Sequence, residues 1–336
     1  MCKIRWSRWN VYSFYVVNCV ILFLGVVRLM QTTIKQHYIP RFYMKNFYIK
    51  DTKKFDLLDK SNYYAPISQN KTENSKELFY VENLYENCNE NPNYIETQIL
   101  AKDNEDSLKT KLGNVIDKIH KEAPLDRDDK SILRKLSIQM SIRNPYGVKA
   151  VEEKYNNVSD RELFFKYSFA SDEHSQEKQK IAEIVQGNFD IIIFTSQESS
   201  LILPDCFSIK LLTNTLKNTF NKEMNILNYV NIYPLTKDIL VCIINNKREI
   251  VKAKKSYIEL QPQEVSSINK LMMCHSDRFC IGDLNRYKSR LSTDLKKPKF
   301  YEEKYLEILK KYDIINGKKR KAAKVHDDNP FLKSIR

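Results

Sequence analysis

The chain has few of the residues from which the common nucleotide, zinc and serine-hydrolase sites are built. Its 336 residues include six glycines and seven cysteines. Neither Gly-x-Gly-x-x-Gly nor Gly-Lys-Ser/Thr occurs, which excludes the familiar glycine-rich loops that cradle phosphates. No Cys-x-x-Cys pair, serine-nucleophile elbow or helix-turn-helix signature occurs either. No cofactor follows from the sequence, and the question of a metal stays open.

The cysteines are scattered rather than paired. Five of them lie in the body of the chain: Cys88, Cys206, Cys242, Cys274 and Cys280. An odd number without regular spacing is typical of small buried thiols in a reducing compartment, not of a disulfide framework. We therefore expect a cytoplasmic location for the body.

The first 29 residues differ from everything that follows. Four basic residues surround an apolar run over residues 11–27. Seventeen residues is at the lower limit for crossing a bilayer, since a membrane-spanning helix needs about 17–25. Three interpretations stay open: a signal-anchor helix that makes the membrane a partner, a cleaved secretory signal, or an upstream start assigned in error, with Met30 as the first residue.

The body, residues 30–290, reads as one α+β domain, followed by a Lys-rich segment over residues 291–336. The patterns predict short N-terminal strands, a helical middle, then a mainly antiparallel sheet with a C-terminal helix. Two extended pieces are expected, one on each side of a turn at residues 59–62. A third is expected at residues 79–81. Helical spacing covers residues 92–119, 124–143, 152–170 and 176–185.

From residue 189 the apolar period changes to that of strands. Short β-branched runs suit an antiparallel sheet at residues 189–195, 200–203, 207–212, 229–233 and 239–244. A helix is then expected from Pro262 to His275, a closing strand at residues 278–281, and an amphipathic helix over residues 301–312.

The net charge of +14 is concentrated at the two ends of the chain. Residues 310–336 alone contain nine Lys or Arg against three Asp. Within them Lys318, Lys319, Arg320 and Lys321 form a basic tail that can neutralise phosphates on nucleic acid, or that simply keeps the terminus solvated. Nucleic acid is therefore a candidate partner of the tail.

The densest aromatic and cationic run lies at residues 36–47. Pro40 favours a short helix that begins there or at the next residue. In such a helix Tyr43 falls on one face, while Arg41 and Lys45, four residues apart, share another. The segment is either an ordinary amphipathic helix packed on the core or a ligand-binding surface.

His37 stands just ahead of this helix. Its imidazole, with an ordinary pKa of about 6.5, suits proton transfer or metal ligation at neutral pH. A single histidine does not decide between a functional and a structural role.

Residues 37–47 reproduce, almost position for position, the signature His-Tyr-(Val/Ile)-Pro-x-Phe-Tyr-(Leu/Met)-(Arg/Lys)-Asn-Phe. The chain thereby resembles the family called domain of unknown function 4238 over residues 35–285. Later features are similar as well: the pair Phe79 and Tyr80, Glu96 ahead of a helix, Arg143 at a helix end, Asp205 after a strand, and Pro234 with Leu235 before a strand. The family has no established activity, so the resemblance implies identity and no reaction.

Two hypotheses about function follow from the sequence. In the first, the chain is a nucleic-acid or partner-binding module that uses the face formed by Tyr38, Arg41, Tyr43 and Lys45 together with the basic tail. In the second, it is a hydrolase, possibly metal-dependent, that acts on a phosphate-containing substrate. Its catalytic groups would be His37, Glu96, Arg143 and Asp205. Helix-dipole effects explain an acid such as Glu96 in a first helical turn and Arg143 in a last turn without any function.

Overall fold

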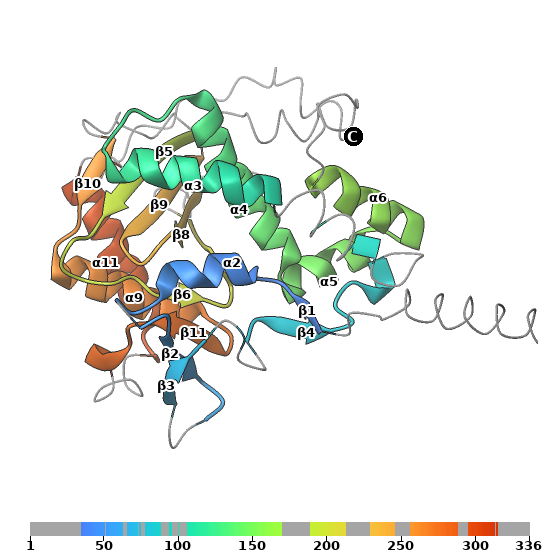
Figure 1. The fold of residues 1–336 in the computed structure, drawn as a ribbon, viewed down its shortest axis with the longest axis horizontal. Coiled ribbons are helices and arrows are strands. Elements are labelled where there is room, and N and C mark those ends of the chain that lie inside the picture. The colour runs from blue at the N-terminus through green and yellow to red at the C-terminus, as the bar shows by residue number, and fades with distance from the viewer. Residues whose placement is uncertain are drawn as a thin grey trace, which may run out of the picture.

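The computed structural model describes residues 35–50, 52–62, 66–72, 74, 78–88, 94–95, 100, 106–169, 189–212, 229–245, 256–287, 295–312 and 314. Over these residues the chain has the α+β fold that the sequence predicted, with three sheets and helices on their faces (Figure 1). The leader, the proposed helix over residues 176–185 and the basic tail lie outside the described residues.

A five-stranded sheet forms the centre of the molecule, with strand order β10-β5-β9-β8-β7. Its strands are β5 (Phe189–Thr195), β7 (Ile209–Leu212), β8 (Tyr229–Pro234), β9 (Ile239–Asn245) and β10 (Tyr257–Glu259). All neighbours are antiparallel except β10 and β5, which are parallel. The β-branched runs at these positions explain the strands, because such side chains pack well on a pleated surface.

The two faces of this sheet enter two different cores. Ile191 and Ile193 of β5 lie in one core, whereas Ile192 and Phe194 of the same strand lie in the other, as the two-residue period of a strand requires. Helices α3 (Asp106–His120) and α4 (Arg127–Arg143) cover the first face. Helices α9 (Pro262–His275) and α11 (Pro298–Lys311) cover the second, so α11 is an integral part of the fold (Figure 1).

A smaller four-stranded sheet has the order β3-β2-β11-β6. It contains β2 (Phe55–Asp59), β3 (Ile67–Lys71), β6 (Leu203–Pro204) and β11 (Phe279–Gly282). The strands β2 and β3 form the hairpin that the sequence predicted. The strand β11 pairs with β2 and β6 and not with the central sheet, so the C-terminal part of the domain is joined to its beginning.

A two-stranded ribbon, β1 (Lys35–His37) with β4 (Tyr80–Glu82), completes the strands. In the chain, β1 is followed by the short helix α2 (Arg41–Met44) and a 3-10 turn, η1 (Lys45–Phe47). Pro40 occupies the N-cap position of α2 in an extended conformation, as the fixed φ of proline predicts.

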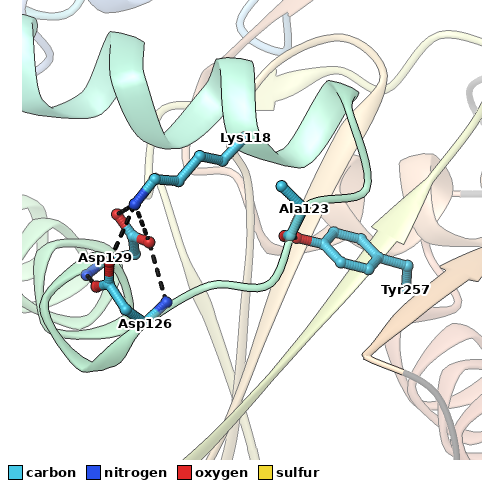
Figure 2. A network of polar contacts seen from close by, with 5 residues as sticks. All are labelled: Lys118, Ala123, Asp126, Asp129 and Tyr257. Carbon is cyan, nitrogen blue, oxygen red and sulfur yellow. Dashed lines mark hydrogen bonds and ion pairs between the residues drawn. The ribbon is translucent and has the colours of Figure 1, made fainter.

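The helical middle is held together by caps and one ion-pair network. The α3–α4 connection carries a capping box, in which Asp126 and Asp129 accept each other's backbone N–H groups. The amine of Lys118 reaches both carboxylates at 3.0 and 2.7 Å, and the hydroxyl of Tyr257 donates to the carbonyl of Ala123 (Figure 2). These contacts tie α3, α4 and β10 together.

Helices α5 (Pro145–Lys154) and α6 (Val158–Phe169) follow α4. Asn144 caps α5 by accepting from the Gly147 N–H at 2.8 Å. A Cβ at Gly147 would lie 2.2 Å from the carbonyl oxygen of Ser141, so only glycine permits this close packing of α5 on α4.

The five cysteines of the body are all free thiols, as expected from their scattered positions. The expectation of a transmembrane helix is wrong for the part of the chain that the structure describes, because none of its helices is long and apolar enough to cross a bilayer. The run over residues 11–27, on which that expectation rested, lies outside the described residues.

Candidate functional site

The second half of the signature segment fixes α2 onto the central sheet. The hydroxyl of Tyr43 donates to the carbonyl of Pro234 at 2.6 Å. The Asn46 side-chain amide donates to the Leu235 carbonyl at 3.4 Å, and the backbone carbonyl of Asn46 accepts from the Lys237 N–H at 3.1 Å. Both family features, the opening signature and the Pro-Leu step, therefore meet at the turn between β8 and β9.

Tyr43 is also a centre of aromatic packing. It is fully buried, with ring centroids 5.2 Å from Phe207 and 5.9 Å from Phe47. Burial raises the pKa of its hydroxyl well above the ordinary value. A nucleic-acid base cannot reach this ring in the folded protein.

The four residues of the predicted binding face are thus divided between the core and the surface. Tyr38 and Tyr43 are buried, whereas Arg41 and Lys45 are exposed. The face keeps its cations and loses its two tyrosine rings, because the Tyr43 ring packs α2 against Phe207 and the Tyr38 ring packs against Phe79.

His37 ends β1, directly opposite Tyr80 on β4, and the two ring centroids are 5.9 Å apart. The imidazole is partly buried. Burial, with the nearby Arg41, Arg143 and Lys35, lowers its pKa from 6.5 to about 4. At neutral pH the imidazole is therefore uncharged and able to accept a proton.

Arg143 ends α4 behind the ribbon. Its side chain is fully buried, and one guanidinium nitrogen donates to the His37 carbonyl at 2.9 Å. The Tyr85 hydroxyl donates to the Arg143 carbonyl at 3.3 Å, and the Tyr85 N–H donates to the Gln36 side chain at 2.8 Å. Arg143 therefore joins the helical middle to the ribbon and places a positive charge behind His37.

Asp205 follows β6 and is buried. Its carboxylate accepts three backbone N–H groups, from Asp277, Arg278 and Phe279, at 2.7–2.8 Å. Burial raises the pKa of this carboxyl, against the opposing effect of the three amides. These bonds hold the turn that leads into β11.

Two bulky residues near these groups have strained backbones. Phe79 and Phe207 have φ values of 50° and 59°, in the left-handed region that aromatic residues rarely adopt. Phe79 precedes Tyr80, and its carbonyl accepts from the Tyr38 N–H at 3.0 Å. Such strain persists only where the surrounding structure enforces it, and it often accompanies functional sites.

The structure brings some of the predicted catalytic residues together. His37 and Arg143 are in direct contact. Asp205 lies close enough to Tyr38, the next residue after His37, to raise the pKa of its hydroxyl further, after the larger effect of burial. Glu96 lies outside the described residues. Among the described residues there is no group of three or more His, Cys, Asp or Glu side chains that could hold a metal.

Sequence reasoning missed Lys35 as a member of this site. Its amine lies 4.8 Å from the Tyr80 ring centroid and its charge acts on His37. The pairing of β1 with β4 brings these residues together, and two strands of three residues each, more than forty positions apart, leave no periodic signal. The sequence predicted an extended piece at residues 79–81 and marked Phe79 and Tyr80 as a family feature, but it did not show which segment pairs with them. Lys35, His37, Tyr80 and Arg41 are called the ribbon cluster below.

These features define an α+β protein with a three-layer centre and a cationic cluster around a neutral histidine. A family model described as "Protein of unknown function (DUF4238)" matches residues 35–284, and the chain belongs to this family. Neither a curated protein nor a solved structure matches it.

Proposed function

We propose that the chain binds single-stranded nucleic acid, with a phosphate at the ribbon cluster. The observation that carries this proposal is the environment of His37. Three cations of the described part of the chain, Arg41, Arg143 and Lys35, act on its imidazole. A partly buried neutral ring among positive charges is a favourable place for an anion.

The ribbon cluster also offers an aromatic group beside the cations. Tyr80 is partly exposed, in contrast to the buried Tyr38 and Tyr43. Stacking of a base on an aromatic side chain contributes about 1–3 kcal/mol and tolerates any base. Tyr80 thus takes the stacking role that the buried tyrosines of the signature cannot take.

The basic tail would extend such a binding surface. Lys318, Lys319, Arg320 and Lys321 lie beyond the described residues, and their contribution is part of the proposal. Contacts from a cationic terminal segment to phosphates act mainly through counterion release, so they would add affinity without adding sequence preference.

Binding of a short fluorescent oligothymidylate, followed by anisotropy between about 50 and 200 mM salt, tests the proposal. Replacing Arg41 by Ala should weaken binding about fivefold and lower the salt slope by about one, because one phosphate contact is lost. Tyr80→Leu should weaken binding about fivefold or more with an unchanged salt slope, since stacking and not charge is removed.

The matched control is Lys299→Ala, which removes the same charge from an exposed position in α11, away from β1 (Figure 1). If this control weakens binding as much as Arg41→Ala does, only the net charge matters and the ribbon cluster is not the site. Deleting residues 317–336 separates the contribution of the tail from that of the cluster.

Hydrolysis of a phosphodiester is the second candidate, favoured by one observation. The low pKa of His37, about 4, keeps its imidazole unprotonated at pH 7, so a ring nitrogen is open to a proton, although a base of such low pKa is weak. Binding is the stronger proposal because the carboxylate of Asp205 is engaged by three backbone amides. Incubating the oligonucleotide with the protein and with Mg²⁺ or Mn²⁺ tests it: cleavage that His37→Gln abolishes, with binding retained, would favour hydrolysis.

A further inference from the structure

A cavity of about 310 Å³ lies between the helical middle and the central sheet, apart from the ribbon cluster. Its described walls come from α4, α5 and α6 on one side and from β7, β8 and β9 on the other (Figure 1). This volume is at the lower end of the range, about 300–1,000 Å³, that small-molecule pockets span. The size suits a small molecule and not a polymer.

The charged side chains that line the cavity are of one sign. Among the described lining residues, Arg134, Lys154 and Lys210 are cations and none is an acid. Arg134 is almost fully buried, with its guanidinium 4.1 Å from the Phe189 ring centroid. Desolvation lowers the pKa of the Lys210 amine, although part of this side chain remains exposed. The described part of the cavity wall therefore carries positive charge, which favours an anionic ligand over a cationic one.

Polar side chains beside these cations offer hydrogen-bonding groups to a ligand. Asn231 is opposite Lys210 on the β7–β8 ladder and is only 4% exposed. Its amide nitrogen donates to the Ser137 hydroxyl at 2.6 Å, while its side-chain oxygen is buried and accepts no hydrogen bond from the residues that the structure describes. A buried acceptor is destabilising unless a donor reaches it. A ligand hydroxyl or N–H group is one such donor.

The rest of the wall is apolar. Ile138 and Ile142 of α4, Val151 of α5, Phe164 of α6 and Ile243 of β9 line it. Apolar walls with a few convergent polar groups are characteristic of ligand pockets. A ligand that fits both parts has an apolar body and one anionic group.

We propose that this cavity binds a small amphipathic anion, with its carboxylate or phosphate between Arg134 and Lys210 and its apolar body against the α4–α6 wall. The site is independent of the ribbon cluster. Its ligand would be a metabolite-sized molecule and not a nucleic-acid strand.

The fluorescence of 1-anilinonaphthalene-8-sulfonate, an aromatic anion, is the probe for this site on the full chain. We expect saturable binding of one dye per chain. Lys210→Met should weaken it about fivefold, and Ala150→Trp, which puts a large ring at the cavity wall, should abolish it. The control Lys149→Met removes the same charge from an exposed position on α5 that does not line the cavity, and should leave binding unchanged.

Competition then identifies the anion. Displacement of the dye by octanoate supports a carboxylate ligand, and displacement by adenosine monophosphate supports a phosphate ligand. Displacement by inorganic phosphate alone, with neither amphipathic anion effective, would overturn the need for an apolar body.

Circular dichroism checks that each variant is folded. If Ala150→Trp does not fold, Lys154→Met replaces it, and its affinity should fall about threefold. Dye binding that is insensitive to Lys210→Met and to the second variant, or equally sensitive to Lys149→Met, would show that the probe sits elsewhere and would overturn the proposal.

Discussion

The two halves of the opening signature differ in the roles of their polar groups, although both bury most of their apolar side chains. The second half, from Tyr43 to Phe47, is buried except at Lys45 and Asn46, and it holds the β8–β9 turn through Tyr43 and Asn46. The first half carries the partly buried His37 and the exposed Arg41. A signature that identifies the family therefore combines a structural clamp with a candidate binding surface.

Residues of the signature thus contribute in two different ways, to the stability of the fold or to the charge of the surface. Tyr43 contributes apolar burial and a hydrogen bond to a backbone carbonyl, which are contributions to the free energy of folding. Arg41 has an exposed guanidinium that donates to the Asn74 side chain at 3.3 Å, and it contributes charge. Substitutions in the second half should therefore lower stability, whereas Arg41→Ala in the first half should lower binding and leave stability nearly unchanged.

The largest expected effect is on the clamp. Tyr43→Ala removes a fully buried ring and should lower the free energy of unfolding by about 3–5 kcal/mol. Tyr43→Phe keeps the ring and leaves the Pro234 carbonyl without its donor, so we expect a loss of about 1–2 kcal/mol. Urea unfolding followed by circular dichroism measures both.

Arg41→Ala is the control from the other half of the signature, with an expected change within about 0.5 kcal/mol. An equal loss of stability in Arg41→Ala and Tyr43→Ala would show that the two halves do not differ.

The next effect concerns Asp205, which the second hypothesis assigned to catalysis. Asp205→Ala leaves three backbone N–H groups without their acceptor, so the free energy of unfolding should fall by about 2–3 kcal/mol. The control Asp277→Ala alters an exposed neighbour on the same turn and should cost about 0.5 kcal/mol or less. A stable Asp205→Ala variant that has lost a measurable activity would restore this residue to a catalytic role.

A smaller effect is the pH dependence that His37 gives to stability. Its pKa is about 4 in the folded chain and 6.5 ordinarily. Between these values the unfolded chain binds more protons, so stability present above pH 6.5 is lost as the pH falls toward 4. His37→Gln removes this contribution, and between pH 7 and pH 5 it should lose about 1 kcal/mol less than the wild type, after allowance for partial exposure.

Parallel urea titrations at the two pH values test this. Identical pH dependence in both proteins would mean that burial and the cations around His37 do not suppress its protonation.

Sequence patterns predicted the long elements well. The predicted helix over residues 124–143 and the strand over residues 189–195 correspond to α4 and β5, because each has enough periodic apolar residues to define its type.

The site itself could be predicted only in part. His37 stood out through the signature, but its neighbours come from the β1–β4 pairing and from the end of α4. Neither contact leaves a local pattern, since each depends on tertiary packing between distant segments. The burial of Tyr38 and Tyr43 was likewise not predictable, because an amphipathic helix does not by itself show whether its aromatic face meets the core or a ligand.

The protonation of His37 with and without bound oligonucleotide tests the central claim most directly. Heteronuclear NMR of the imidazole, assigned by comparison with His37→Gln, should give a pKa of about 4 for the free protein. When an oligothymidylate saturates the protein, a phosphate beside the ring should raise the His37 pKa toward its ordinary value of about 6.5, since negative charge favours the imidazolium. An unchanged His37 pKa in a saturated complex would show that the strand binds elsewhere and would contradict the assignment of the ribbon cluster as the site.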